Sequence, residues 1–113
     1  MAQSNKRCMI NQAKISEIIN KITEGYQPSK VLLFGSYATG NANDNSDLDL
    51  IVVKNTNTPK SQRGRELRKL LYGSLVPLDV KIYTPQEFND EQKIEYSFLN
   101  TALKNSKVVY EQQ

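Results

Sequence analysis

The chain has 113 residues, of which 38% are hydrophobic and 24% charged, and a formal net charge of +3. This composition is ordinary for one globular domain with a modest core, and no apolar run approaches the length needed to span a membrane. Histidine is absent, which excludes Ser-His-Asp catalysis and zinc sites that use imidazole. The lone cysteine, Cys8, cannot form an intramolecular disulfide, which favours a reducing, cytoplasmic setting.

We expect residues 9–113 to form one domain and treat residues 1–8 as a candidate disordered N-terminus. The first helix is predicted by isoleucines at the i, i+3, i+4, i+7 spacing: Ile15, Ile18, Ile19 and Ile22. Gly25 would end this helix. A strand is predicted at 31–34, followed by a turn at 35–36 and a short helical turn that Gly40 would close.

A loop rich in turn formers at 41–46 leads to a second predicted strand at 48–53. Thr58-Pro59 has the pattern of an N-cap followed by proline at the first helical position, so a helix is expected to begin there. It would carry three leucines, with Gly64 as a weak point: Leu67, Leu70 and Leu71.

A third strand is predicted at 78–83, and Thr84-Pro85-Gln86-Glu87 fits a capping box that begins another helix. The last predicted helix presents four apolar residues: Phe98, Leu99, Ala102 and Leu103. This order of elements predicts an α+β fold, a mixed β-sheet with helices packed mainly on one face. The other face would be an open groove.

The pattern most informative about chemistry joins the first two predicted strands. Gly35-Ser36 follows the first strand, and Asp47 and Asp49 enter the second after ten intervening residues. Alternate residues of a strand share a face, so both carboxylates are expected on one side. A glycine-serine turn with free N–H groups suits phosphate, and paired carboxylates suit a hard divalent cation. The pattern predicts a site for a metal–nucleotide complex.

A third acid, Asp79, lies within the apolar third strand. A carboxylate there is costly unless something such as a cation compensates its desolvation. Lys81 shares the strand face of Asp79 and is equally compatible with a phosphate contact and with an ion pair to a site carboxylate. Simpler roles remain open, namely turn formation for Ser36 and a loop or cap role for the Asp47–Asp49 pair.

A calcium loop across 41–49 is disfavoured, because the sixth-position glycine and the distal glutamate of an EF-hand are absent. The basic residues between 60 and 69 are most simply a solvated helix face, with phosphate or partner contact as the alternative. Action on RNA 3′ ends would need a nucleic-acid surface, and only this basic cluster suggests one, so nucleic acid is not an expected partner.

Gly35-Ser36, the spacer, Asp47-x-Asp49 and Asp79 resemble the nucleotidyltransferase superfamily that includes DNA polymerase beta. The chain's length and its ending, from Phe98-Leu99 to Val108-Val109-Tyr110-Glu111, resemble the minimal nucleotidyltransferases within it. The resemblance covers roughly residues 10–110 and implies the nucleotidyltransferase fold. In that family the acceptor is commonly a tyrosine of a HEPN-domain toxin, which would make this chain an antitoxin.

The resemblance implies transfer of a nucleoside monophosphate, with ATP as the default donor, to an acceptor hydroxyl. Asp47, Asp49 and Asp79 would hold two Mg²⁺ ions, with Mn²⁺ as an alternative, and Asp79 would be the general base. Gly35 and Ser36 would bind the β- and γ-phosphates.

Thr39 stands where relatives often carry an arginine, and threonine cannot grip phosphate in a bidentate manner. We expect weaker triphosphate binding unless Lys54, Arg63 or Arg65 compensates. The alternative function is a catalytically weak nucleotide- or metal-binding module that neutralises or scaffolds a partner protein by contact. A homodimer or a hetero-complex would help to cover the apolar edge of so small a sheet.

Overall fold

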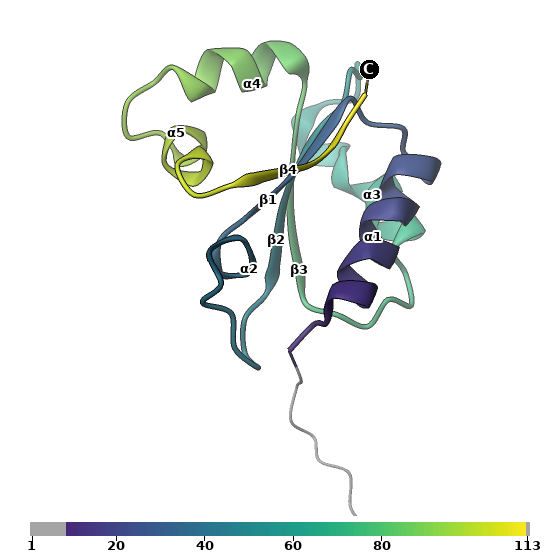
Figure 1. The fold of residues 1–113 in the computed structure, drawn as a ribbon. Coiled ribbons are helices and arrows are strands. Elements are labelled where there is room, and N and C mark those ends of the chain that lie inside the picture. Colours follow the sequence, from purple (N-terminus) through teal and green to yellow (C-terminus); the bar gives the residue numbers. More distant parts are fainter. Residues whose placement is uncertain (1–8, 113) are drawn as a thin grey trace, which may run out of the picture.

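The computed structural model describes residues 9–112, and the predicted N-terminal disorder at 1–8 lies outside the described residues. One mixed sheet forms the centre of the molecule, and helices lie on both sides of it (Figure 1). The elements in chain order are α1 (Gln12–Gly25), β1 (Lys30–Phe34), α2 (Ser36–Thr39), β2 (Leu48–Val53), η1 (Lys60–Gln62), α3 (Gly64–Leu70), β3 (Leu78–Tyr83), α4 (Pro85–Gln92), α5 (Phe98–Leu103) and β4 (Lys107–Glu111). The predicted α+β fold with a mixed sheet is confirmed.

The strands lie in the order β3-β2-β1-β4. β1 pairs antiparallel with both β2 and β4, whereas β2 and β3 are parallel and are joined through η1 and α3. The β2–β3 register is continuous and sets Asp49 opposite Asp79. The β1–β4 register shifts between Val31 and Leu32, so this pair carries an irregularity.

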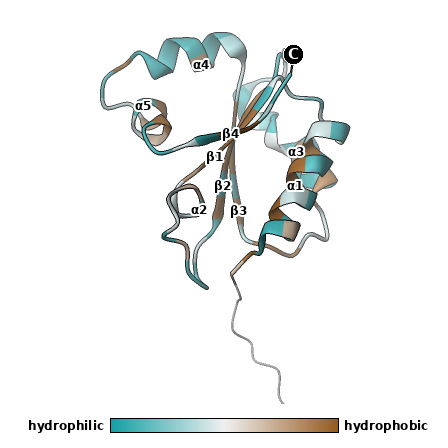
Figure 2. Ribbon diagram, viewed as in Figure 1, coloured by the Kyte–Doolittle hydropathy of each residue, from teal (hydrophilic) through white to brown (hydrophobic). Residues whose placement is uncertain are grey.

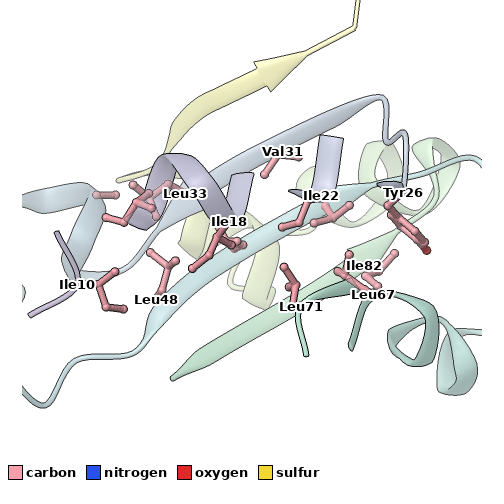
Figure 3. Close-up of a cluster of buried hydrophobic side chains, with 14 residues drawn as sticks. Ile10, Ile18, Ile22, Tyr26, Val31, Leu33, Leu48, Leu67, Leu71 and Ile82 are labelled. Atoms are coloured by element: carbon pink, nitrogen blue, oxygen red, sulfur yellow. The ribbon is translucent and has the colours of Figure 1, made fainter. Parts of the chain in front are cut away.

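The larger core lies between the sheet and the helices α1 and α3. Three isoleucines of α1 face it, and Ile18 and Ile22 are completely buried (Figure 3). The apolar side of α1 faces the sheet while its polar side faces solvent (Figure 2). The isoleucine spacing therefore predicted both the helix and its buried face.

A second, smaller cluster lies on the opposite face of the sheet. Leu32, Phe34 and Ile51 pack there against Leu99 of α5, with Phe88 of α4 alongside. Alternate strand residues thus serve two cores. The face that we expected to be an open groove is therefore partly covered by α4 and α5, because the apolar residues of these helices need a surface to pack against.

Two helix starts test the capping predictions. Thr84 and Glu87 form the predicted capping box: the Thr84 side chain accepts from the Glu87 amide, and Glu87 accepts from the Thr84 amide. The prediction at Thr58-Pro59 is wrong, because Pro59 precedes the single 3₁₀ turn of η1 and the α-helix begins at Gly64. Gly64 is therefore the first residue of α3 and not a weak point inside a helix.

Two glycines end helices in different ways. Gly40 closes α2 in the left-handed conformation, at φ +83°, as predicted. Gly25 is the last residue of α1, and a Cβ added there would lie 2.5 Å from Cδ2 of Leu70. The glycine therefore allows α1 to pack closely against α3. Within residues 9–112, no helix is long and apolar enough to cross a membrane.

Candidate active site

Gly35 connects β1 to α2 and lies directly against Asp49. Its φ of +75° is a conformation that side-chain-bearing residues rarely adopt. A Cβ at this position would collide with Oδ2 of Asp49 and would lie 3.2 Å from its Cγ. The absence of a side chain at Gly35 therefore leaves room for the Asp49 carboxylate beside the turn. The two halves of the predicted motif are thus in direct contact.

Asp49 and Asp79 lie opposite each other on neighbouring parallel strands. The apolar neighbours of both residues pack toward α1 and α3, so the two aspartates face the side of the sheet that carries α4 and α5. Asp47 lies two residues before Asp49 at the entrance to β2 and is exposed. The structure thus brings the predicted acids to one end of one face.

The negative charges of this cluster repel one another. Burial raises the pKa of Asp49 above its usual value, the negative charges of Asp79 and Asp47 raise it further, and Lys81 opposes them. Neighbouring carboxylates that repel one another favour protonation or the arrival of a cation. The cluster is therefore chemically suited to a positively charged ligand.

Lys81 pairs with Asp79. Its Nζ lies 3.2 Å from Oδ1 of Asp79 and 5.7 Å from the centre of the Phe98 ring. Both charged side chains are nearly half exposed, so the pair is open to solvent and to an incoming ligand. Of the two roles left open for Lys81, this structure contains the ion pair.

Carboxylate oxygens are the donors that Mg²⁺ and Mn²⁺ prefer, and mutual repulsion at Asp49 is what a divalent cation would relieve, so the donor set fits such an ion. As the side chains stand in residues 9–112, no three acidic or cysteine groups converge into a ready-made metal site. The assignment of Asp47, Asp49 and Asp79 as metal ligands therefore stays a prediction.

Ser36 and Thr39 belong to the single helical turn α2. The amides of Ala38 and Thr39 donate to the Gly35 carbonyl, at 3.0 and 3.3 Å, which fixes the turn. The Thr39 hydroxyl lies 3.4 Å from the Ser36 carbonyl and accepts from the side chain of Asn41 at 3.2 Å. The residue that replaces the family's arginine is thus engaged within its own turn and loop.

Two of the cations proposed to compensate for that arginine have structural roles elsewhere. Lys54 donates to the carbonyls of Tyr26 and Gln27, at 2.7 and 3.3 Å, near the far end of β2. Arg63 is buried and forms a bidentate pair with Glu87. Arg65, the third of these cations, is exposed on α3 and lines a shallow surface hollow there with Arg68.

Two hollows lie near the acids, the first along the outer edge of β3 and the second beside α2 and α5. The first, of about 490 Å³, is lined by basic and aromatic side chains, among them Lys60, Arg68, Lys81, Tyr83 and Phe98. The second, of about 470 Å³, lies next to Gly35 and Thr39 and is lined by Tyr96, Phe98 and Asn105. Tyr96 and Phe98 were not predicted as site residues, because their distance in sequence from the motif gave no signal.

A family model described as polymerase beta, nucleotidyltransferase, matches residues 14–113, and the chain belongs to this family. It is similar to a Methanocaldococcus jannaschii protein named "putative protein adenylyltransferase", with 29% identity over 104 residues that make up 90% of this chain and 100% of the relative.

Solved structures share the fold. A chain of a toxin–antitoxin structure with AMP-PNP matches with a TM-score of 0.60 and 21% identity, over 91% of this chain and 75% of the other. A chain from a complex of a tri-AMPylated Shewanella oneidensis HEPN toxin with an MNT antitoxin matches with a TM-score of 0.53 and 17% identity, over 90% and 73%. At these identities the likeness establishes the fold alone.

Proposed function

We propose that this chain transfers AMP from ATP to a hydroxyl of a partner protein, with release of pyrophosphate. We further propose that it acts as an antitoxin by adenylylating a tyrosine of a HEPN-domain toxin. The observation that carries the proposal is the Asp49 carboxylate seated against Gly35 and opposite Asp79. This arrangement brings together the turn that we propose to bind phosphate and the carboxylates that we propose to bind the cations. Family membership supports nucleotidyl transfer, and the named relative supports protein as the acceptor.

Each residue has a proposed role that follows from its position. Gly35 and Ser36 bind the β- and γ-phosphates through backbone amides and the serine hydroxyl, because the turn leaves no side chain at Gly35 to obstruct close approach. Asp79 accepts the proton of the attacking hydroxyl, and Lys81, at 3.2 Å, orients its carboxylate. No histidine is available for the proton transfer.

Asp47 and Asp49, with Asp79, would hold the divalent cations of the reaction. Mg²⁺ or Mn²⁺ bound there, two ions on our proposal, would supply Lewis-acid stabilisation of the charge that develops on the phosphates and on the attacking oxygen. The acids themselves contribute by drawing cations and by fixing where the charge is neutralised. The single cysteine fits the reducing cytoplasm in which we propose that the protein acts.

The HEPN partner rests on the solved structures, since toxin–antitoxin complexes share this fold. The hollow beside Lys81 and Phe98 is lined by basic and aromatic groups, which can receive a phosphate together with a ring. It lies next to Asp79, the residue proposed to accept the proton. An aromatic hydroxyl acceptor therefore suits the surroundings of Asp79 on the α4–α5 face.

Thr39 favours a second candidate function. Threonine carries no charge to offer a triphosphate, and its hydroxyl is already engaged by the Ser36 carbonyl and the Asn41 side chain. A chain that binds nucleotide without efficient turnover would neutralise its partner by contact alone.

The test incubates purified protein with MgCl₂, ATP labelled at the α-phosphate, and the protein encoded by the neighbouring gene. Transfer of label by the wild type, lost in Asp49→Asn and retained in Asp44→Asn, supports the proposal. Asp44 is the matched control because it is an exposed acid in the loop that precedes β2. Undiminished transfer by Asp49→Asn would refute the site. Absence of transfer with AMP-PNP binding intact would favour the contact function.

A further inference from the structure

A hollow of about 470 Å³ lies between α2 and α5, apart from the one that we propose for the acceptor (Figure 1). Its walls are largely apolar and include Phe34 of β1, Ala102 of α5 and the rings of Tyr96 and Phe98. None of the described residues that line it is basic or acidic. A concave apolar site with aromatic walls suits a flat ring and not a phosphate group.

Gly35 connects this hollow to the turn that we propose to bind phosphate. The glycine lines the hollow and also lies against the Asp49 carboxylate. Thr39 lines the hollow too, but its side chain is short and is bonded within its own turn, so the hollow stays open. A nucleotide whose phosphates lie at Gly35 and Asp49 therefore has its base within reach of the hollow. Phe98 lines both hollows, so one ring separates the base from the acceptor.

Tyr96 lines the hollow and is nevertheless 83% exposed. Its φ of +68° is one that residues with a side chain rarely adopt. The chain that follows it is fixed, because the Ser97 hydroxyl donates to the Glu91 carbonyl at 2.9 Å and the Leu99 amide donates to the Glu91 carboxylate at 3.0 Å. A residue held in a rare backbone conformation at the border of a hollow is typical of a ligand contact. An exposed tyrosine on a fixed backbone can stack on a ligand with little loss of freedom.

The other aromatic rings of the hollow are already packed. Phe34 is buried and meets Phe98 edge to face, with 5.5 Å between the ring centres, so Tyr96 is the ring most open to a ligand. Asn105 adds an exposed side-chain amide to the lining. Such an amide can bond the exocyclic amino group and a ring nitrogen of adenine together, whereas guanine presents an acceptor in place of that amino group.

We propose that the hollow between α2 and α5 binds the adenine ring of ATP, with Tyr96 stacked on the ring and Asn105 hydrogen-bonded to its edge. This inference rests on the proposed function and names the residues that select the nucleotide. The phosphates then lie at Gly35 and the acids, and the base and the acceptor lie on different sides of Phe98.

The test measures, by isothermal titration calorimetry with MgCl₂, the binding of AMP-PNP and of inorganic tripolyphosphate, which has no base. Tyr96→Asn removes the ring and suits the left-handed backbone. It is expected to weaken AMP-PNP binding about tenfold, as the loss of one base–aromatic stack does, and to leave tripolyphosphate binding unchanged. Tyr96→Phe keeps the ring and should bind like the wild type. The wild type should bind GMP-PNP more weakly than AMP-PNP, and Asn105→Ala should narrow this difference.

Tyr72→Asn is the matched control, because Tyr72 is 89% exposed and does not line this hollow, so AMP-PNP binding should be unchanged. Circular dichroism establishes that each variant is folded. Unchanged AMP-PNP binding by Tyr96→Asn would overturn the proposal, and so would an equal weakening of AMP-PNP and tripolyphosphate. A wild type that prefers GMP-PNP, or that binds AMP-PNP no more tightly than tripolyphosphate, would also overturn it. Because the readout is binding, a failure here is distinct from a failure of nucleotidyl transfer.

Discussion

The buried pair between Arg63 and Glu87 leads to a quantitative prediction for the variant Glu87→Gln. Arg63 is 6% exposed, and its guanidinium lies 2.6 and 3.0 Å from the two carboxylate oxygens of Glu87. It also donates to the Thr58 carbonyl, at 2.8 Å. Glutamine preserves the shape but removes the negative charge, so the variant leaves a buried cation without its counterion.

The magnitude follows from the pKa of Glu87, which its hydrogen bonds to Arg63 and to the Thr84 amide lower from 4.5 to about 2. At 1.36 kcal/mol per pKa unit, this sets an upper limit of about 3 kcal/mol. The Glu87 side chain is 37% exposed, so solvent screens part of the interaction, and we expect a loss of about 2 kcal/mol at pH 7. Because the folded-state pKa lies below the unfolded value, the native state binds fewer protons, and the stabilisation is complete above about pH 4.5 and is lost as the pH falls toward 2.

The assay is urea unfolding of wild type and Glu87→Gln at pH 7 and at pH 3. The difference in unfolding free energy is expected at pH 7 and should shrink at pH 3. Glu17→Gln is the control, since Glu17 pairs with Lys14 and Lys21 at the surface, at 3.4 and 3.6 Å, and should lose less than about 1 kcal/mol. If Glu87→Gln matched this control at pH 7, or if its deficit were the same at both pH values, the reasoning would be refuted.

Gly35→Ala is expected to abolish transfer because its methyl group meets the Asp49 carboxylate, whereas Gly40→Ala has open space and should retain transfer. Gly40→Ala should lose about 1–2 kcal/mol of stability, and Gly35→Ala more, since its ψ of −155° lies in a region that is essentially restricted to glycine. Equal transfer activities would contradict the collision. Without divalent cations, Asp49→Asn should raise the melting temperature, because it removes a carboxylate whose pKa is raised by burial and by neighbouring acids. A lower melting temperature would argue against this electrostatic explanation. Ile18→Ala leaves a cavity beside α1 and should cost about 3 kcal/mol in urea unfolding, and a loss below about 1 kcal/mol would show that the site collapses readily.

Elements marked by local chemistry were predictable from sequence. The isoleucine spacing of α1 and the capping box at Thr84 depend on residues within one or two turns of each other, and both predictions are confirmed. The start of α3 was not predictable in this way. Thr58-Pro59 has the composition of a helix start, but the chain there forms the 3₁₀ turn η1, and the Thr58 carbonyl instead receives a bond from the side chain of Arg63.

The candidate site likewise contains residues that local sequence predicted and residues that only tertiary packing brings together. Gly35 and Asp49 were recognised because their spacing forms a motif, and the structure adds that they touch. Arg63 was treated as a surface cation, and only the tertiary fold, which brings the residue before α3 close to the start of α4, places its guanidinium beside Glu87. The aromatic lining from Tyr96 and Phe98 depends on where α5 packs, which the local sequence does not determine.

The sheet order also constrains how the protein forms during synthesis. β1 is an interior strand with β4 as its outer neighbour, and Lys30 pairs with Glu111 from near the opposite end of the chain. Until translation has passed residue 111, Leu32 and Leu33 lack this neighbouring strand. Such distant pairing slows folding and exposes the nascent chain to aggregation. Completion of the sheet thus waits for residues 107–111, although the acids of the candidate site are encoded earlier.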